Sequence, residues 1–235
     1  MTSAEKEQVI KRDWEIYWAD KERAGNAVYD FFAGIYRRLV VKKSLNHFVK
    51  KYFSRGMKVL HAGCGSGQVD VDISEFIDIT ALDISTNALS IYKRTNRGAG
   101  KIVQGTIFDL PFPDTTFDGL YNLGVLEHFS QDDIRKILLE CKRVLKPGGR
   151  AILFWPPTFG FTVLVLDSAH FVLNKIFRMK INLHPAEITR LRSRQHAIDS
   201  LEEAGFEIVK CYFGPRDLFT QVVVVADKPR HHESE

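Results

Sequence analysis

The stretch VLHAGCGSGQ, Val59 to Gln68, decides the fold of this chain, together with the run ALDIS at Ala81 to Ser85. Glycines at positions 63, 65 and 67 follow an apolar run, and Asp83 ends the next apolar run. Because glycine has no side chain, a ligand can lie directly against the backbone of such a turn. A carboxylate at the tip of the neighbouring strand can accept hydrogen bonds from both hydroxyls of a ribose. The pattern therefore predicts a site for an adenosine-type cofactor.

Two cofactor classes use this geometry, and the spacing of the glycines separates them. A dinucleotide fingerprint has the pattern G-x-G-x-x-G with an acid about 20 residues further on. Asp83 meets the second requirement, but Gln68 stands where the third glycine is needed. The observed G-x-G-x-G pattern fits enzymes that use S-adenosylmethionine (SAM) better. A nicotinamide-dependent dehydrogenase is therefore the weaker alternative.

Length and composition indicate one globular domain. The chain has 235 residues, of which 45% are hydrophobic and 26% charged, which is enough to bury a substantial core. The net charge of +4 does not by itself indicate a nucleic-acid partner. Cys64, Cys141 and Cys211 show no C-x-x-C spacing, which favours a reducing compartment over disulfides or a zinc site. The polar N-terminus carries no secretory signal, so we expect a cytoplasmic protein.

Apolar strands alternate with amphipathic helices along the middle of the chain. This alternation predicts a parallel sheet with helices on both faces and a ligand beyond the carboxyl ends of its strands. Helices are expected at Gln68–Phe76, Thr86–Thr95, from the capping residue Ser130 to Pro147, and at Ser193–Ala204. Strands are expected at Lys58–Ala62, Ile77–Asp83, Lys101–Gly105, Phe117–Leu123, Arg150–Trp155, Phe206–Phe213 and Gln221–Ala226.

The segment Ala27–Phe53 has apolar residues at close to helical spacing and is basic elsewhere. The basic run extends from Arg37 to Lys58 and contains no acid. A basic amphipathic helix can lie on an anionic membrane or bind RNA. The simpler interpretation is a helix packed on the edge of the sheet with its basic face in solvent.

The segment Thr158–Phe177 is apolar and aromatic and has about the length of a membrane span. Polar residues such as Asp167 and Lys175 interrupt it, and polar groups are costly in lipid, so no transmembrane helix is predicted. We expect an inserted amphipathic cap over a substrate pocket with Trp155 at its entrance; a buried packing helix is the alternative. The aromatic N-terminal residues Trp14, Tyr17 and Trp18 can fold over the same site.

From about Lys51 to Ala226 the chain resembles the class I SAM-dependent methyltransferases, in the branch that includes quinone-, sterol- and small-molecule-modifying enzymes. The resemblance rests on VLHAGCGSG, ALDIS, Gly105–Phe129, Arg143–Pro157 and LEEAGF. It implies an α/β fold with a doubly wound, mostly parallel, Rossmann-like sheet of seven strands, the last one antiparallel. The expected single domain comprises an N-terminal helical segment (1–56), a cofactor-binding core (57–155), the cap (156–192) and a C-terminal helix with a strand pair (193–235).

The resemblance also implies a set of cofactor contacts. The glycines approach the methionine and ribose of SAM, Asp83 binds the ribose hydroxyls, and Ile84 packs on adenine. The backbone at the end of the fourth strand meets the methionine. The full set of expected cofactor-binding residues is Gly63, Cys64, Gly65, Gly67, Asp83, Ile84, Thr106, Ile107, Asn122 and Leu123.

Two positions depart from the family pattern. His61 stands where an acid is frequent and often helps to hold the cofactor's ammonium group. Thr106 stands where an aspartate usually lies beside adenine. Both changes are expected to weaken cofactor binding, and they leave open a member of the family that has lost catalysis.

His128 is the candidate catalytic residue, because it follows the fourth strand and histidine is the natural base near neutral pH. The alternative is that Glu127 and His128 form a structural loop. Some relatives hold a metal with E-x-x-E-H, but Gly124 occupies the first position here, so no metal is predicted. His170 and His184 are interpreted as surface or packing residues. The acids Asp70, Asp72 and Glu75 are interpreted as a solvated face near a helix N-terminus.

The predicted function is transfer of a methyl group from SAM to a small apolar or aromatic acceptor. The alternatives are an RNA or protein methyltransferase that uses the basic helix, and a non-catalytic binding module. The expected partner is a small-molecule acceptor, with a peripheral membrane surface as a second candidate. Nucleic acid is disfavoured, because the sequence shows no stacking platform and no N-P-P-Y-type motif.

Overall fold

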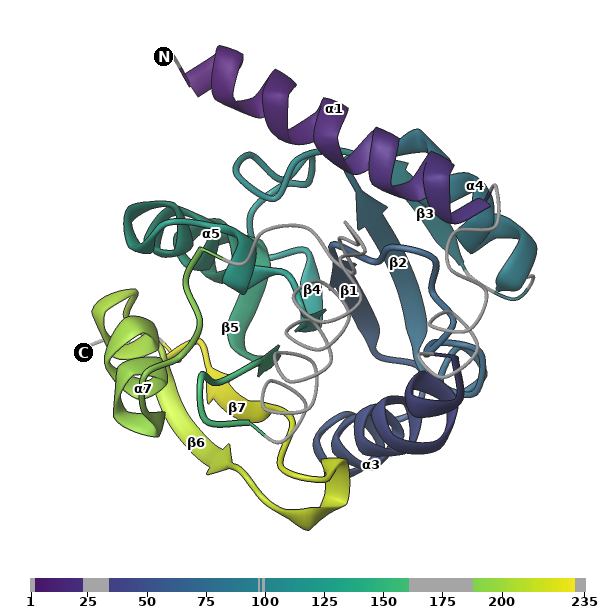
Figure 1. Ribbon diagram of the computed structural model, residues 1–235. Coiled ribbons are helices and arrows are strands. Elements are labelled where there is room, and N and C mark those ends of the chain that lie inside the picture. The colour runs from purple at the N-terminus through teal and green to yellow at the C-terminus, as the bar shows by residue number, and fades with distance from the viewer. Residues whose placement is uncertain (1–2, 23–33, 97, 99, 161–187, 231–235) are drawn as a thin grey trace, which may run out of the picture.

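The computed structural model describes residues 3–22, 34–96, 98, 100–160 and 188–230. A seven-stranded sheet with the order β3-β2-β1-β4-β5-β7-β6 forms its centre (Figure 1). Strands β1 to β5 pair in parallel, and β7 is antiparallel to both of its neighbours, β5 and β6. This arrangement confirms the predicted Rossmann-like fold. The strands are β1 Lys58–Ala62, β2 Asp78–Asp83, β3 Lys101–Gln104, β4 Phe117–Leu123, β5 Leu145–Trp155, β6 Glu207–Tyr212 and β7 Val222–Asp227.

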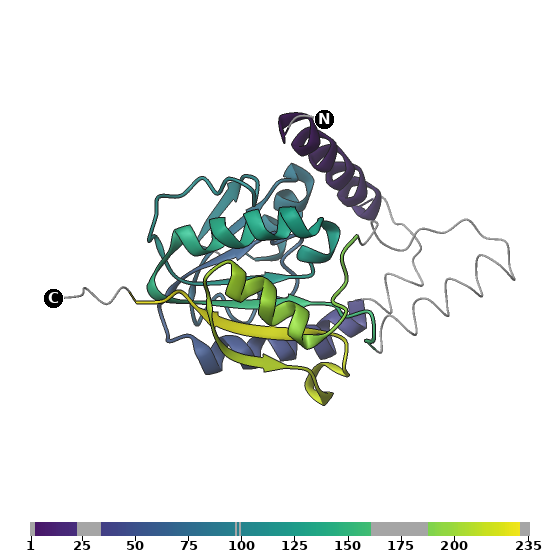
Figure 2. The same cartoon turned by 90° about the vertical axis from the view of Figure 1, so that its left-hand side faces the viewer.

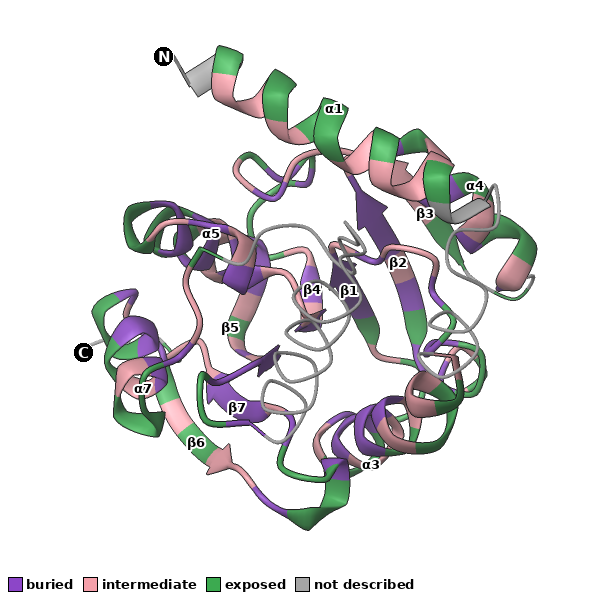
Figure 3. Cartoon of the chain, viewed as in Figure 1, coloured by how far each residue is buried: buried purple, intermediate pink, exposed green. Residues whose placement is uncertain are grey.

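Helices cover both faces of this sheet. Helices α3 and α4 bury apolar side chains against one face, and α5 and α7 against the other. The strands serve both layers at once: in β7, Val222 and Val224 belong to one apolar cluster and Val223 and Val225 to the other. Figure 3 shows β7 as buried along its length. The helices are α1 Ser3–Glu22, α3 Lys42–Tyr52, α4 Thr86–Thr95, α5 Gln131–Val144 and α7 Arg194–Glu203, and the short helical turns are η1 Arg37–Val41, η2 Leu126–His128 and η4 Pro215–Asp217.

The predicted helix at Gln68–Phe76 is wrong. The chain instead makes successive turns, in which the N–H of Asp70 donates to the carbonyl of Gly67 and that of Ile73 to the carbonyl of Asp70. Two causes act together. Val69, Val71 and Ile73 are β-branched and lose side-chain freedom in a helix. The buried side chain of Asp70 also fixes the backbone from inside the protein.

Two other boundaries differ from the sequence-based expectations by more than one residue. Helix α5 begins at Gln131 as expected, because the Ser130 side chain accepts a hydrogen bond from the N–H of Asp133. It ends at Val144, however, and β5 starts at the next residue, Leu145, five residues before its expected start at Arg150.

The N-terminal basic segment is helical from residue 34 onward, with η1 running into α3, and residues 27–33 lie outside the described part of the chain. Helix α3 buries Leu45, Phe48 and Val49 in the core, so it packs on the protein as the simpler interpretation expected, but on a face of the sheet and not on its edge. The expected cap helix lies, from residue 161, outside the described residues as well. Within the part that the structure describes, no helix is both long and apolar enough to span a bilayer.

Candidate functional site

The loop after β1 brings bare backbone to the carboxyl edge of the sheet. Gly63 and Gly65 have φ angles of 76° and 52°, in the left-handed region that favours glycine. A Cβ atom on Gly65 would lie only 2.8 Å from the ring of Trp18. The loop is fastened to β2, because the N–H groups of Gly63 and Cys64 both donate to the carbonyl of Leu82, at 2.8 and 2.9 Å. The loop therefore has a fixed shape, and at Gly65 there is no room for a side chain.

Asp83, at the end of β2, is tied to this loop. One of its carboxylate oxygens accepts the N–H of Gly65 at 2.8 Å, and the other accepts the N–H of Ser85 at 2.9 Å. Burial raises the pKa of Asp83, and the two N–H donors oppose that rise. A carboxylate offers about four acceptor positions. Two of them are used by these bonds, so the group retains capacity for the two vicinal hydroxyls of a ribose.

The remaining predicted cofactor-binding residues differ in how far they are exposed to solvent. Ile84 and Leu123 are half-buried, and the Thr106 hydroxyl accepts the N–H of Phe108 at 3.2 Å. Ile107 is buried in the core, so its role beside adenine stays a prediction. The buried Asn122 side chain donates to the carbonyl of Ala62 at 2.9 Å and so joins the carboxyl ends of β4 and β1. With its amide used in this way, Asn122 can meet a cofactor through its backbone, as expected.

His61 and Asp70 form a buried pair beneath the glycine loop. Their side chains approach to 2.7 Å, between Nδ1 of His61 and Oδ2 of Asp70, and both are almost fully buried. The hydroxyl of Tyr92 donates to the same carboxylate oxygen at 2.8 Å, and the ring of Tyr121 lies 4.2 Å from that of His61. The interpretation of Asp70 as a solvated residue is therefore wrong. The local pattern gave no signal of this, because the neighbouring Val71 is 42% exposed whereas Asp70 is buried.

Cys64 sits in the loop but is not a nucleophile. Burial, and then the nearby carboxylates of Asp83 and Asp70, raise its pKa well above the ordinary value. A thiol reacts as its thiolate, so this side chain stays protonated and inert at neutral pH. Its part in the site is to contribute backbone to the loop.

Helix α1 crosses the carboxyl edge and is held at the start of α4 (Figures 1 and 2). The Glu15 carboxylate accepts hydrogen bonds from the hydroxyls of Ser85 and Thr86, at 2.8 and 2.7 Å, and from the N–H groups of Thr86 and Asn87, at 2.7 and 3.1 Å. Burial alone would raise the pKa of Glu15, but these donors hold it below its ordinary value. Glu15 therefore supplies the negative charge that a helix N-terminus favours. Sequence spacing offered no sign of this contact, which spans about seventy residues.

Aromatic side chains of α1 lie over the site. Trp18 packs on Gly65, and the ring of Trp14 meets that of His128 edge-on, with centroids 5.0 Å apart. Tyr17 stands between the two tryptophans, in edge-on contact with each. At its other end α1 is anchored by an ion pair between Lys6 and Asp133 in the first turn of α5. The N-terminal aromatic residues thus lie against the glycine loop and His128, where they were expected to fold.

His128 lies in η2, where the site meets this aromatic wall. Its side chain is 11% exposed, and its Nε2 lies 3.9 Å from a carboxylate oxygen of Glu127. The carbonyl of Glu127 accepts the N–H groups of Ile188 and Thr189, which fastens residues 188 and 189 to η2. Among the residues that the structure describes, no group of three His, Cys, Asp or Glu side chains is placed to bind a metal. His170 and His184 lie outside those residues.

Trp155, which directly precedes the predicted cap, offers no exposed surface to a substrate. It is fully buried at the end of β5, where its indole N–H donates to the carbonyl of Thr189 at 3.1 Å. Its bulk serves the core and holds the segment that leads into α7. The aromatic surface of the site comes from α1 instead.

The central part of the chain matches a known family of protein domains. Residues 60–153 match the methyltransferase domain family. A sterol 24-C-methyltransferase of Gibberella zeae is 30% identical over 66% of this chain and 40% of its own length. A demethylmenaquinone methyltransferase of Bacillus licheniformis is 31% identical over 51% of this chain and 54% of its own. The chain thus spans about half the length of the curated relatives it matches.

A solved structure agrees at the level of the fold. A SAM-dependent methyltransferase from Thermotoga maritima superposes with a TM-score of 0.65, at 21% identity, over 92% of this chain and 99% of that one. The domain match and the named relatives imply SAM as the cofactor. Residues 60–153 thus match the methyltransferase domain family, within a fold that is shared with SAM-dependent methyltransferases of known structure.

Proposed function

We propose that this protein transfers the methyl group of SAM to a small apolar or aromatic acceptor. One observation carries the proposal: the glycine loop and Asp83 meet directly beneath the aromatic side chains of α1. The loop and the carboxylate suit an adenosine-type cofactor. The aromatic wall suits a flat or apolar acceptor beside it.

The residues present fit SAM in their chemistry. The loop at Gly63–Gly67 would hold the methionine part, and Asp83 would accept hydrogen bonds from the ribose hydroxyls. When bound, SAM supplies a methyl group that its sulfonium already activates for in-line displacement. The protein then contributes alignment and exclusion of water. Holding two reactants in attack geometry can supply up to about 10 kcal/mol of the barrier.

His128 is proposed as the base for an acceptor that must lose a proton, such as a phenol or an enol. Its place beside Trp14 at the end of β4 supports this role. Histidine can take a proton near neutral pH, and general-base catalysis typically contributes about 10²- to 10⁴-fold in rate. For an acceptor that needs no deprotonation, the ring serves as part of the acceptor wall.

The proposal is tested by incubating the protein with methyl-labelled SAM and a panel of phenolic, quinone-like and lipid acceptors. Transfer of label to at least one apolar acceptor is expected, together with an equal amount of S-adenosylhomocysteine. The curated relatives named above act on a sterol and on demethylmenaquinone, which is the reason to include both classes. Label transfer confined to RNA or to protein would contradict the proposal.

A second candidate function is a non-catalytic binding module. Asp83 is only 8% exposed, and Trp18 lies on the loop, so in the described structure the cofactor edge is covered. The two departures at His61 and Thr106 are its sequence support. SAM binding without transfer to any acceptor would favour this candidate.

A further inference from the structure

Five apolar side chains are exposed on neighbouring segments, to between 40 and 56%. Three segments contribute them, and three contacts join these segments. The ring of Phe213 lies 5.1 Å from Phe159 and 5.5 Å from Phe219. The Tyr36 hydroxyl donates to Thr220 at 2.5 Å and so holds the start of η1 against the end of the η4 loop. We call this surface the docking patch; its members are Ile35, Leu39, Phe159, Leu218 and Phe219.

The η4 loop exposes its share of the patch at an energetic cost. Leu218 and Phe219 both have φ angles of 58°, in the left-handed region that residues other than glycine rarely adopt. The loop is closed by N–H groups of these two residues, which donate to the carbonyls of Pro215 and Gly214. Two large apolar side chains are thus held in water on a strained backbone. Strain of this kind tends to persist at sites that bind something.

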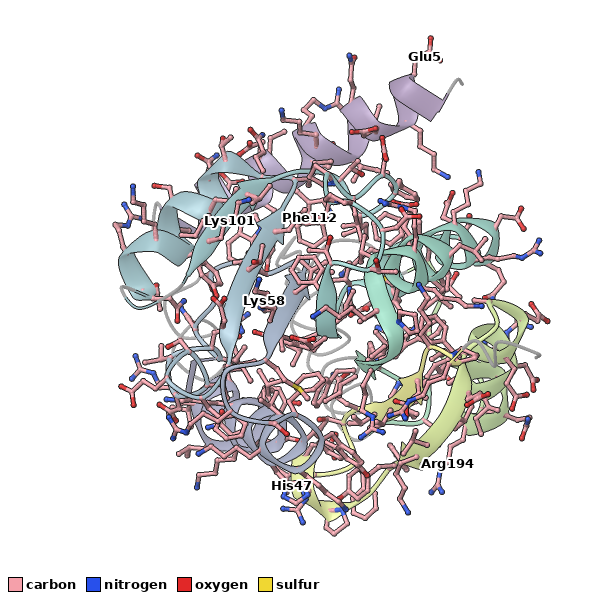
Figure 4. The ribbon with its side chains drawn as sticks, turned by 180° about the vertical axis from the view of Figure 1, so that it is seen from behind. Glu5, His47, Lys58, Lys101, Phe112 and Arg194 are labelled. Carbon is pink, nitrogen blue, oxygen red and sulfur yellow. The ribbon has the colours of Figure 1, made fainter. Side chains whose placement is uncertain are left out.

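The patch is bordered by positive charge from two directions. Arg38 and Lys43 are exposed on η1 and α3, and Arg216 is exposed on the η4 loop. His47 of α3 lies beside that loop (Figure 4): its burial, and then the charges of Arg216 and Lys51, lower its pKa. The bases of α3 and of the η4 loop therefore share one surface.

Negative charge is scarce on the segments that form this surface. Residues 34–58 contain no acid, and residues 208–221 contain only Asp217, which is 1% exposed. The neighbouring acid Asp72 forms an ion pair with Lys42 at 2.8 Å. It therefore does not neutralise the charges of the bases nearer the patch. The surface therefore combines exposed apolar side chains with exposed cations and offers no exposed acid of its own.

We propose that the docking patch binds an anionic membrane surface. Apolar side chains that enter the boundary between headgroups and acyl chains, with cations among the headgroups, are the pattern of peripheral membrane binding. A second copy of the chain would bring like charges together. RNA fits less well, because three of the five members, Ile35, Leu39 and Leu218, have no flat face on which a base can stack.

The position of the patch links it to the site. Strands β5 and β6 end, and β7 begins, at the edge of the sheet where the glycine loop and Asp83 lie. Docking through the patch would turn this edge toward the bilayer. An apolar acceptor could then pass from lipid to the site; this last step rests on the proposed function, whereas the surface itself does not.

The experiment is sedimentation of the full chain with vesicles of phosphatidylcholine, alone or mixed with phosphatidylglycerol. Binding to the mixed vesicles only, weakened by salt, is expected. A double variant with Leu39→Gln and Phe219→Gln, and another with Arg38→Glu and Arg216→Glu, should each lower the partition coefficient by about tenfold or more. The matched controls Leu139→Gln and Lys136→Glu, at exposed positions of α5, should bind as the unchanged protein does.

A single variant separates binding from stability. Leu218→Gly removes an apolar side chain and relieves the left-handed backbone, so it should raise the melting temperature while lowering vesicle binding. Variants that sediment as the unchanged protein does, or equal binding to neutral and anionic vesicles, would overturn the proposal. Salt-sensitive binding to RNA without binding to vesicles would also overturn it.

Titration with SAM on the same preparations keeps the two proposals apart. Intact SAM binding without vesicle binding refutes the membrane surface alone. Vesicle binding without SAM binding refutes the proposed function and leaves the membrane surface standing.

Discussion

The ring of Trp18 packs directly on the backbone of Gly65, so that helix α1 closes the glycine loop from above. Any ligand of that loop must share the space with this ring or displace it. The anchor of α1 at Glu15 therefore controls access to the site as well as the position of α4.

Replacing Glu15 by Gln is expected to destabilise the protein by about 1 kcal/mol, because it weakens a cap that four donor groups share. The pKa of Glu15 is lowered in the fold. The stability that the Glu15 carboxylate contributes is therefore present at pH values above the ordinary carboxyl pKa. It is lost as the pH falls through the lower pKa that Glu15 has in the folded protein. Thermal unfolding at neutral and acid pH measures both effects. Asp20→Asn, an exposed acid on the same helix, is the control, and an equal effect there would contradict the role of Glu15.

Replacing Asp70 by Ala is expected to cost about 2–4 kcal/mol, because it leaves the buried His61 and Tyr92 without their shared partner. Urea denaturation measures the loss. Asp72→Ala is the matched control two residues away, because Asp72 is exposed and its ion pair with Lys42 is worth at most about 1 kcal/mol. Similar losses for the two variants would show that the buried cluster does not carry the stability assigned to it.

Asp217 should make stability depend on pH in the opposite sense to Glu15. Burial raises the pKa of Asp217 from 3.8 to about 6, although the backbone hydrogen bonds that the carboxylate accepts act to lower it. Between these two values the folded protein binds more protons than the unfolded chain, so stability falls as the pH rises through this window. Asp217→Asn keeps an oxygen for the N–H of Gln221 and should flatten that part of the profile. The melting temperature between pH 4 and pH 7 is the measurement; an unchanged slope in the variant would refute the assignment.

His128→Gln should leave SAM affinity within about twofold and lower kcat for a phenolic acceptor by about 10²-fold or more. The reason is that the ring contacts Trp14, which belongs to the proposed acceptor wall. The variant's rate should recover as the pH approaches the pKa of the phenol, since the acceptor then deprotonates without help. A loss of SAM affinity with an unchanged pH profile would make His128 a structural residue.

Local sequence signals predicted the fold well. The cap at Ser130, the apolar stripe of α5 and the alternation of strands each depend on residues a few positions apart. The glycine loop and Asp83 also follow from spacing, because each ends a strand of a parallel sheet and so must meet at one edge.

Contacts between distant segments explain what the sequence did not predict. Asp70 was read as the solvated residue of a helix, but its pairing with His61 and Tyr92 turned it inward and replaced the helix with turns. No local sequence signal predicted that Glu15 caps α4. The exposed apolar side chains at residues 35–39 and in the η4 loop come together through tertiary contacts such as the Tyr36–Thr220 hydrogen bond. In each case tertiary contacts override local propensity.

The most direct test of the central claim is calorimetric titration of the full chain with SAM, S-adenosylhomocysteine and NAD. We predict micromolar binding of the first two, no binding of NAD, and a loss of at least about tenfold in SAM affinity for Asp83→Ala, which removes the acceptor of the ribose hydroxyls. Failure to bind SAM or its product, or binding that Asp83→Ala leaves unchanged, would contradict the assignment of the glycine loop and Asp83 as the cofactor site.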